Sequence, residues 1–161
     1  MWPSIALLAL VTLQRLVELL VSQSNSRRLL DVGGHEVATG HYPAIVAVHA
    51  AWLITLWWLA PGRPIILPFL LLFILIEAGR VWVLSTLGRR WTTRIIVVPG
   101  ETLVASGPYR FVNHPNYLVV AGEAAVLPLV FGLWQVALIF SALNAAVLAV
   151  RIRAENRALG R

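Results

Sequence analysis

The sequence predicts an all-α integral membrane protein with five transmembrane helices, of which the last two form a helical hairpin. Hydrophobic residues make up 59% of the 161 residues, and charged residues make up only 12%. The mean hydropathy is +0.80, whereas a soluble domain is nearer a quarter charged. This length suits one transmembrane domain over residues 1–161. The absence of cysteine excludes disulfides, thiolate catalysis and cysteine-ligated metals.

Three apolar segments precede the polar middle of the chain. They cover residues 2–21, 42–60 and 64–87. Each has about the 20 residues that a helix needs to cross a bilayer. A Pro61–Gly62 turn separates the second segment from the third. We therefore expect three spanning helices before residue 88.

The long apolar run from residue 115 to residue 150 predicts the hairpin. Glu123 is its only charged residue. As one helix the run would measure roughly 54 Å, against a hydrocarbon core of about 30 Å. It must fold back, and Pro128 marks the turn. We expect spans at 115–131 and 133–150.

The distribution of arginine predicts the orientation, because all thirteen basic residues are arginine. Five spans place the segments 22–41, 88–114 and 151–161 on one side, with two, four and four arginines respectively. Only Arg63 falls on the other side. Since basic loops stay in the cytoplasm, we expect a multi-pass protein of the inner (cytoplasmic) membrane with its N-terminus outside and its C-terminus cytoplasmic. The pI near 11.3 reflects this asymmetry, so the expected partner is the lipid bilayer and not nucleic acid.

Two pairs of opposite charges lie inside the predicted spans. Arg15 and Glu18 are three residues apart, as are Glu77 and Arg80, so each pair shares a helix face. They form either two intrahelical ion pairs, which reduce the cost of burial, or the wall of a polar cavity. The four histidines lack metal-ligand spacing, so no metal site is expected.

The segment Ser106–Tyr117 is the candidate site, because it places arginine, histidine and two tyrosines between apolar segments. Such residues are costly beside lipid and usually have a function there. His114 and Tyr117 lie near one face of the fourth span, and Pro115 stands in its first turn. Backbone N–H groups at this helix start favour an anionic group such as a carboxylate.

The loop before this segment predicts a small β-hairpin. Residues 91–98 are β-prone, Pro99–Gly100 is a turn, and residues 102–105 are a candidate return strand.

The tail holds a second polar pair, Arg151 and Glu155, four residues apart on one helix face. A snorkelling arginine cluster at the membrane surface accounts for the other tail arginines but less well for this pair.

Several motifs together resemble the isoprenylcysteine carboxyl methyltransferase family of membrane methyltransferases, most closely over residues 87–159. These motifs are Leu87-Gly88-x-x-Trp91-Thr92-Thr93, Pro99-Gly100, Ser106-Gly107-Pro108-Tyr109-Arg110, His114-Pro115-Asn116-Tyr117 and Arg151-x-x-x-Glu155. The earlier part of the chain is similar to the short bacterial branch, some of whose members O-methylate alkylpyrones or alkylresorcinols made by type III polyketide synthases.

The resemblance implies S-adenosylmethionine as the cofactor, with S-adenosylhomocysteine as the product, and a site built from the cytoplasmic loop and the C-terminal helix. It implies catalytic roles for Arg151 and Glu155 near the transferred methyl group. The cofactor-binding residues that it implies are Tyr109, His114, Pro115, Tyr117, Leu118 and Glu123. Two positions depart from the family: Asn113 replaces an arginine, and Asn156 replaces a second tail glutamate.

The leading hypothesis is therefore a methyltransferase that acts on an oxygen, in a carboxylate or in a phenol or enol, of a lipophilic small molecule. A phospholipid N-methyltransferase-like enzyme, an NADPH-dependent reductase related to the steroid 5α-reductases and a non-enzymatic lipid-binding protein are the alternatives. No Gly-x-Gly-x-x-Gly unit follows a strand, so a soluble-type nucleotide site is not supported.

Overall fold

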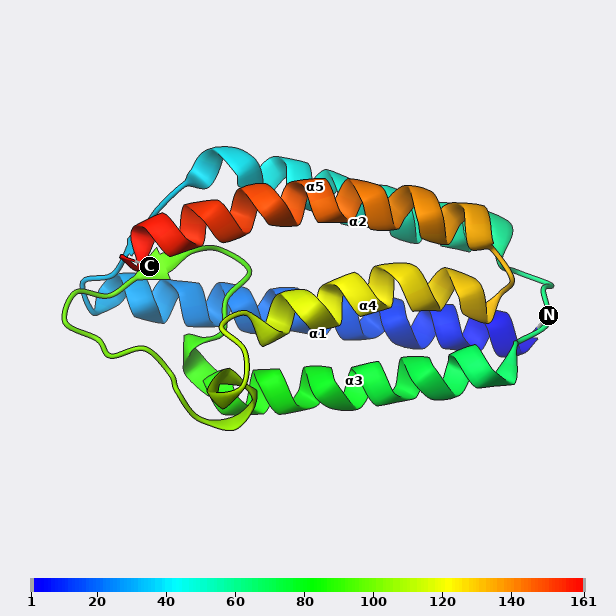
Figure 1. Cartoon of the computed structure of the whole chain (residues 1–161), viewed down its shortest axis with the longest axis horizontal. Helices are drawn as coiled ribbons and strands as arrows, with labels where there is room; N and C mark the ends of the chain where they lie inside the picture. The colour runs from blue at the N-terminus through cyan, green and yellow to red at the C-terminus, as the bar shows by residue number, and fades with distance from the viewer. Residues whose placement is uncertain (1, 161) are drawn as a thin grey trace.

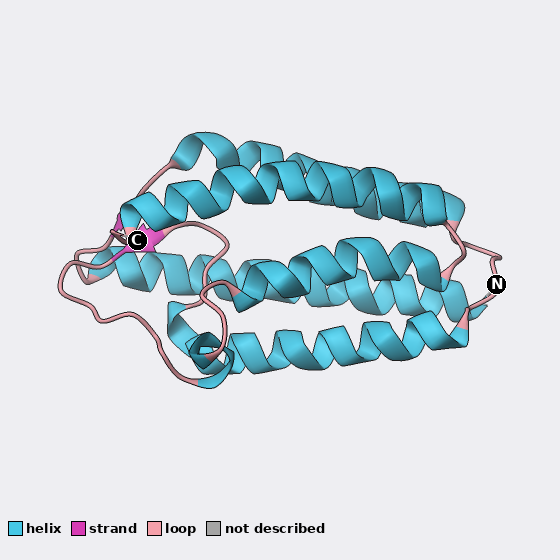
Figure 2. Cartoon of the chain, in the orientation of Figure 1, coloured by secondary structure: helices cyan, strands magenta, loops and turns pink. Residues whose placement is uncertain are grey.

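The computed structural model describes residues 2–160, which form a bundle of five long helices (Figure 1). Their bounds are α1 Trp2–Asp31, α2 Tyr42–Leu59, α3 Leu67–Leu87, α4 Pro115–Val130 and α5 Trp134–Ala158. Within these residues, α1, α2, α3 and α5 are long and apolar enough to cross a membrane, and α4 is a shorter apolar helix. The predicted all-helical membrane class is confirmed, and helix covers nearly all of the bundle (Figure 2).

Two helices run past the predicted membrane spans. Helix α1 continues to Asp31 and α5 continues to Ala158. The extension of α1 is held by Asn25, whose Nδ2 donates to the carbonyl oxygens of Trp91 at 2.8 Å and Gly88 at 3.3 Å. These extensions carry the polar tail of each helix into the loop region.

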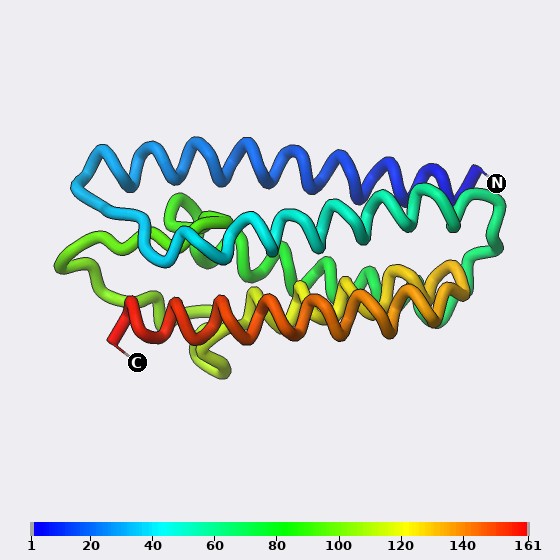
Figure 3. Tube along the Cα trace, turned by 90° about the horizontal axis from the view of Figure 1, so that it is seen from above, coloured from blue at the N-terminus to red at the C-terminus, as the bar shows by residue number. Residues whose placement is uncertain are grey.

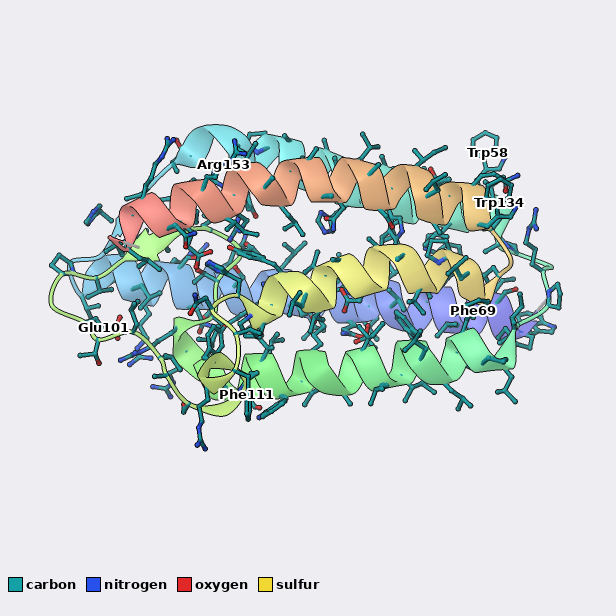
Figure 4. The ribbon with its side chains drawn as sticks, in the orientation of Figure 1. Trp58, Phe69, Glu101, Phe111, Trp134 and Arg153 are labelled. Carbon is teal, nitrogen blue, oxygen red and sulfur yellow. The ribbon has the colours of Figure 1, made fainter. Side chains whose placement is uncertain are left out.

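The two long loops lie at one end of the bundle together with the C-terminus, and the N-terminus lies at the other end (Figures 1 and 3). Within residues 2–160, this arrangement brings together the segments that hold nine arginines. Trp58 and Trp134 lie at the N-terminal end, where they are largely exposed (Figure 4). Tryptophan is enriched where membrane meets water, so this end has the composition of a membrane interface.

The two loops pair through a minimal sheet. Strand β1, His35–Glu36, is antiparallel to β2, Ile96–Val97, with His35 opposite Val97. The predicted return strand at 102–105 is wrong, because that segment is irregular in the structure. The partner of β2 comes instead from the first loop, since the extension of α1 delivers that loop beside residue 95, where the Val37 N–H donates to the Ile95 carbonyl.

A 3₁₀ turn, η3 Gly107–Arg110, packs on α3 just before α4 begins. Gly107 has a φ of +55°, and a Cβ there would collide with the side chain of Thr86. Only glycine adopts this backbone conformation at so close an approach without strain. Gly107 therefore sets the direction in which the chain enters the start of α4.

The hairpin between α4 and α5 is confirmed. Its turn spans residues 131–133, where the N–H groups of Phe131 and Leu133 both donate to the Pro128 carbonyl, at 3.1 and 2.9 Å. The hydrophobic core gathers Leu8, Leu56, Phe73, Leu127 and Phe131, all nearly inaccessible. Because the hairpin returns the chain to its starting end, the tail of α5 comes to lie beside the first turn of α4.

Candidate active site

The first turn of α4 and the last turns of α5 meet in a hydrogen-bonded cluster of Tyr117, Arg151 and Glu155. Arg151 Nε donates to the Tyr117 hydroxyl oxygen at 2.8 Å, and this hydroxyl donates to Glu155 Oε2. The guanidinium carbon of Arg151 also lies 5.6 Å from the centre of the Tyr117 ring. Arg151 is only 7% exposed. The tyrosine thus joins the two tail residues that are four apart on α5.

His114 extends the cluster on the loop side. Its ring stacks on the Tyr117 ring with centroids 5.3 Å apart. Nε2 donates to Asn156 Oδ1 at 2.9 Å, and Nδ1 lies 3.7 Å from Glu155 Oε2. Asn156, one of the two departures from the family pattern, therefore orients the histidine of the His-Pro motif.

A cavity of about 200 Å³ with a mixed polar and apolar lining opens beside the cluster, and we call it the polar cavity because the second cavity, described below, is mostly apolar. Tyr109, His114, Tyr117, Arg151 and Glu155 line it from one side, and the loop residues 90–104 supply most of the other. Burial raises the pKa of Tyr109 to about 12, with a smaller contribution from the Glu155 carboxylate. The Tyr109 phenol therefore stays neutral, as a hydrogen-bonding group, at physiological pH.

A second cavity of about 330 Å³ lies deeper in the bundle and is mostly apolar. It runs between α1, α2, α4 and α5, and Arg80 of α3 and the loop residues 91–93 complete its lining. The two cavities share five lining residues, which are Trp91, Thr92, Asn116, Tyr117 and Arg151. The hydrogen bond from Arg151 to Tyr117 thus stands where the polar cavity meets the apolar one.

Arg80 organises the charged residues within the bundle. It contacts Glu18 with Nε at 2.6 Å and Nη2 at 2.5 Å, and it contacts both oxygens of Glu123 with Nη1 at 3.0 and 3.1 Å. Arg15 binds the same two carboxylates, at 2.9 and 2.8 Å. Glu77 accepts a hydrogen bond from Gln14. The expected Arg15–Glu18 pair is confirmed.

The interpretation of Glu77 and Arg80 as an intrahelical pair is wrong, because Arg80 reaches across to α1 and α4. Spacing along α3 places both on one face, but the partner is decided by which carboxylate the neighbouring helices present. Glu18, Arg80 and Glu123 also line the apolar cavity. The charged residues therefore form one cluster in the wall of a cavity and not two isolated intrahelical pairs, although the cavity itself is mostly apolar.

Comparison with known proteins gives a family assignment. The sequence pattern of the isoprenylcysteine carboxyl methyltransferase family matches residues 69–161. The chain belongs to this family. It is also similar to the uncharacterized protein YpbQ of Bacillus subtilis, with 35% identity over 95% of this chain and 94% of the relative. No solved structure matches the chain.

The family consists of membrane methyltransferases that use S-adenosylmethionine. With its spanning helices, the chain is a multi-pass membrane protein of the methyltransferase type. Among residues 2–160, no group of three or more histidine, aspartate or glutamate side chains is placed to hold a metal ion.

The residues implied by the family fall into two groups in the structure. Tyr109, His114 and Tyr117 line the polar cavity with the two tail residues. Pro115 is buried as the first residue of α4. Leu118 is 63% exposed, and Glu123 lies in the Arg80 cluster at the apolar cavity, so neither lines the polar cavity.

Sequence reasoning missed three residues at the junction of the cavities. Trp91 and Thr92 were noted only as part of a motif, and Asn116 was the variable position of His-Pro-x-Tyr. Within residues 2–160, the Asn116 Oδ1 and the Trp91 Nε1 are buried without a hydrogen-bond partner. The sequence did contain a signal for Asn116, which is a polar side chain in the first turn of a membrane helix. Buried polar groups of this kind usually have a hydrogen-bond partner, so such a residue is a candidate for a ligand contact.

Proposed function

We propose that the protein is an S-adenosylmethionine-dependent methyltransferase that methylates an oxygen, in a carboxylate or in a phenol or enol, of a lipophilic small molecule. The observation that carries this proposal is the shared wall of the two cavities at Tyr117 and Arg151. A methyl group must pass between a water-soluble donor and an acceptor with an apolar body. One polar and one apolar cavity that meet at a hydrogen-bonded cluster suit that pair of ligands.

The polar cavity suits the cofactor chemically. Glu155 offers a carboxylate to the ammonium and sulfonium groups of the cofactor. Two arginines, Arg90 and Arg94, line the same cavity, each paired with a glutamate, and the carboxylate of the cofactor would share their positive charge. Asn116 brings an amide oxygen without a partner among residues 2–160. The cofactor supplies a methyl group already activated by a positively charged sulfur.

Arg151 would orient the acceptor. Its Nε is engaged by Tyr117, and among residues 2–160 its two terminal nitrogens make no ion pair. Those nitrogens suit an oxyanion, and a fixed guanidinium holds such a group in line for transfer. For a phenol or enol, Glu155 within the cluster and His114 next to it are the groups that can accept the proton. A carboxylate acceptor is already ionised and needs only Arg151.

The proposed orientation places the polar cavity in the cytoplasm, where the cofactor is available, with the N-terminus outside the inner membrane. The bundle end that holds both long loops and the C-terminus would then face the cytoplasm (Figure 1). Loop arginines at that end support this orientation. The acceptor would enter the apolar cavity from the bilayer.

Calorimetry of the detergent-purified protein with S-adenosylhomocysteine tests the cofactor. We expect binding by the natural protein, at least tenfold weaker binding by His114→Ala, and unchanged binding by His35→Ala, which alters an exposed histidine outside the cavity. Absence of binding by the natural protein contradicts the proposal. Protection from heat by NADPH instead would favour the reductase alternative.

Transfer of a radiolabelled methyl group to a membrane lipid extract tests the acceptor. Label that base releases indicates a carboxyl ester, and label that resists base but lies on a phenol indicates an ether. Label on an amine would contradict O-methylation and support the phospholipid alternative.

A further inference from the structure

A layer of polar side chains crosses the apolar cavity farther from the loop end of the bundle than the Tyr117–Arg151 cluster. It consists of one residue from each helix in order, namely Glu18, His49, Arg80, Glu123 and Asn144, and all of them line the cavity. We call these five residues the polar layer.

The polar layer lies at one depth in the bundle. Asn144 is seven residues from Arg151 on α5, and His49 is seven residues from Tyr42 on α2. At about 1.5 Å per residue, both sit roughly 10 Å from the loop end of the cavity. Glu123, six residues from Tyr117 on α4, is roughly 9 Å away on the same scale. The layer is therefore about two helical turns from the proposed transfer site.

Three members of the polar layer satisfy one another, because Arg80 binds Glu18 and Glu123. Asn144 differs. It is 2% exposed, and within residues 2–160 its Oδ1 has no hydrogen-bond partner. The indole Nε1 of Trp52, which lines the same cavity one turn beyond His49, is also buried without a partner in that part of the chain.

These groups offer both kinds of hydrogen bond. Asn144 presents an acceptor, and the soft terminal torsion of an asparagine allows its amide to turn toward the cavity. Trp52 presents a donor. His49 Nδ1 donates to the Ile45 carbonyl at 2.8 Å, so the neutral ring has Nε2 as an acceptor. Buried polar groups without hydrogen-bond partners cost free energy, and a purely apolar ligand would supply no such partner.

We propose that Asn144 of the polar layer and Trp52, one turn beyond the layer, form a second recognition subsite, which binds a hydroxyl group on the apolar body of the methyl acceptor. A hydroxyl both donates and accepts one hydrogen bond, so it suits Asn144 together with Trp52. The acceptor class is a lipophilic molecule with a hydroxyl about 10 Å from the oxygen that receives the methyl group. This inference rests on the proposed function, because it names the substrate class of the same site.

Tryptophan fluorescence provides a binding assay that does not depend on catalysis, because Trp52 and Trp91 line the cavity. The probes are two matched pairs: octadecanoate and a hydroxyoctadecanoate, and a long-chain 4-alkylphenol and its chain-hydroxylated form. In each pair the hydroxyl stands about 10 Å from the head-group oxygen. The full-length protein in detergent is titrated with both members, and their affinity ratio is compared between variants, which cancels partition into micelles.

We expect the hydroxylated member of at least one pair to bind the natural protein about tenfold more tightly, the effect of about one added hydrogen bond. Asn144→Leu should reduce the ratio to near one. Gln135→Leu, which also replaces an amide by leucine but at an exposed position of α5, should leave the ratio unchanged. Trp52→Phe, which removes the donor but keeps an aromatic ring, should lower the ratio even if Asn144→Leu folds poorly.

Equal affinities within both pairs for the natural protein would overturn the inference, as would an Asn144→Leu or Trp52→Phe variant that keeps the full preference. Calorimetry with S-adenosylhomocysteine on the same samples separates the two proposals. Cofactor binding without a hydroxyl preference refutes the second subsite and leaves the methyltransferase proposal standing. A hydroxyl preference without cofactor binding refutes the methyltransferase proposal and leaves the hydroxyl-binding subsite standing.

Discussion

Replacement of Arg80 tests whether the charged cluster holds the bundle together. Arg80 is 5% exposed and directs three guanidinium nitrogens to Glu18 and Glu123, at distances from 2.5 to 3.1 Å. In Arg80→Leu, Arg15 is the one cation among residues 2–160 that still pairs with these two carboxylates, so one negative charge remains uncompensated among apolar helices. Breaking a buried ion pair by removing one partner costs about 3–5 kcal/mol. We expect a loss of unfolding free energy in that range.

The assay is equilibrium unfolding in mixed micelles, followed by circular dichroism. Arg63→Leu, at an exposed position in the turn between α2 and α3, serves as the control and should change stability by less than about 0.5 kcal/mol. Because the cost comes from unpaired carboxylates, Glu123→Gln in the Arg80→Leu background should restore part of the lost stability. If the second substitution instead adds its own full cost, the two residues are not coupled and the reasoning is refuted.

Two further predictions concern the approach to the site. Gly107→Ala should destabilise the protein by about 1 kcal/mol or more, because φ is +55° and the Thr86 side chain occupies the space of the new methyl group. A thermal melt measures this change, and unchanged stability would show that η3 relaxes freely. Burial raises the pKa of Tyr109 from 10.0 to about 12, so the folded state keeps a proton that the unfolded state loses, and stability should fall as pH rises through that window. Tyr109→Phe should flatten this fall in unfolding free energy, and an identical pH profile would contradict the assigned burial.

Much of the fold follows from apolar run lengths. The run from residue 115 to residue 150 is too long for one crossing, and this alone predicts the α4–α5 hairpin. The hairpin in turn brings Arg151 and Glu155 back beside Tyr117, so the cluster was predictable as a meeting of two motifs. The hydrogen bond from Arg151 to Tyr117 was not predictable, because the side-chain rotamers that form it depend on packing in the folded bundle.

Cross-helix partners were beyond the reach of sequence patterns. Spacing shows that Glu77 and Arg80 share a face, but it does not show that α1 and α4 present Glu18 and Glu123 to that face. The pairing of Ile96–Val97 with the first loop was missed for the same reason, because it depends on where the extension of α1 ends. Asn144 was visible only as an amide in an apolar run, with nothing to reveal its depth or its neighbours.

Methyl transfer by an Arg151 variant tests the central claim most directly. Labelled methyl transfer from S-adenosylmethionine to a membrane lipid extract is compared between the natural protein and Arg151→Gln, with S-adenosylhomocysteine affinity measured on both. We predict transfer by the natural protein and a loss of about a hundredfold or more in the variant, with cofactor affinity changed by less than about threefold, because Arg151 would position the acceptor. Equal transfer by both proteins, or no transfer by either, would contradict the account.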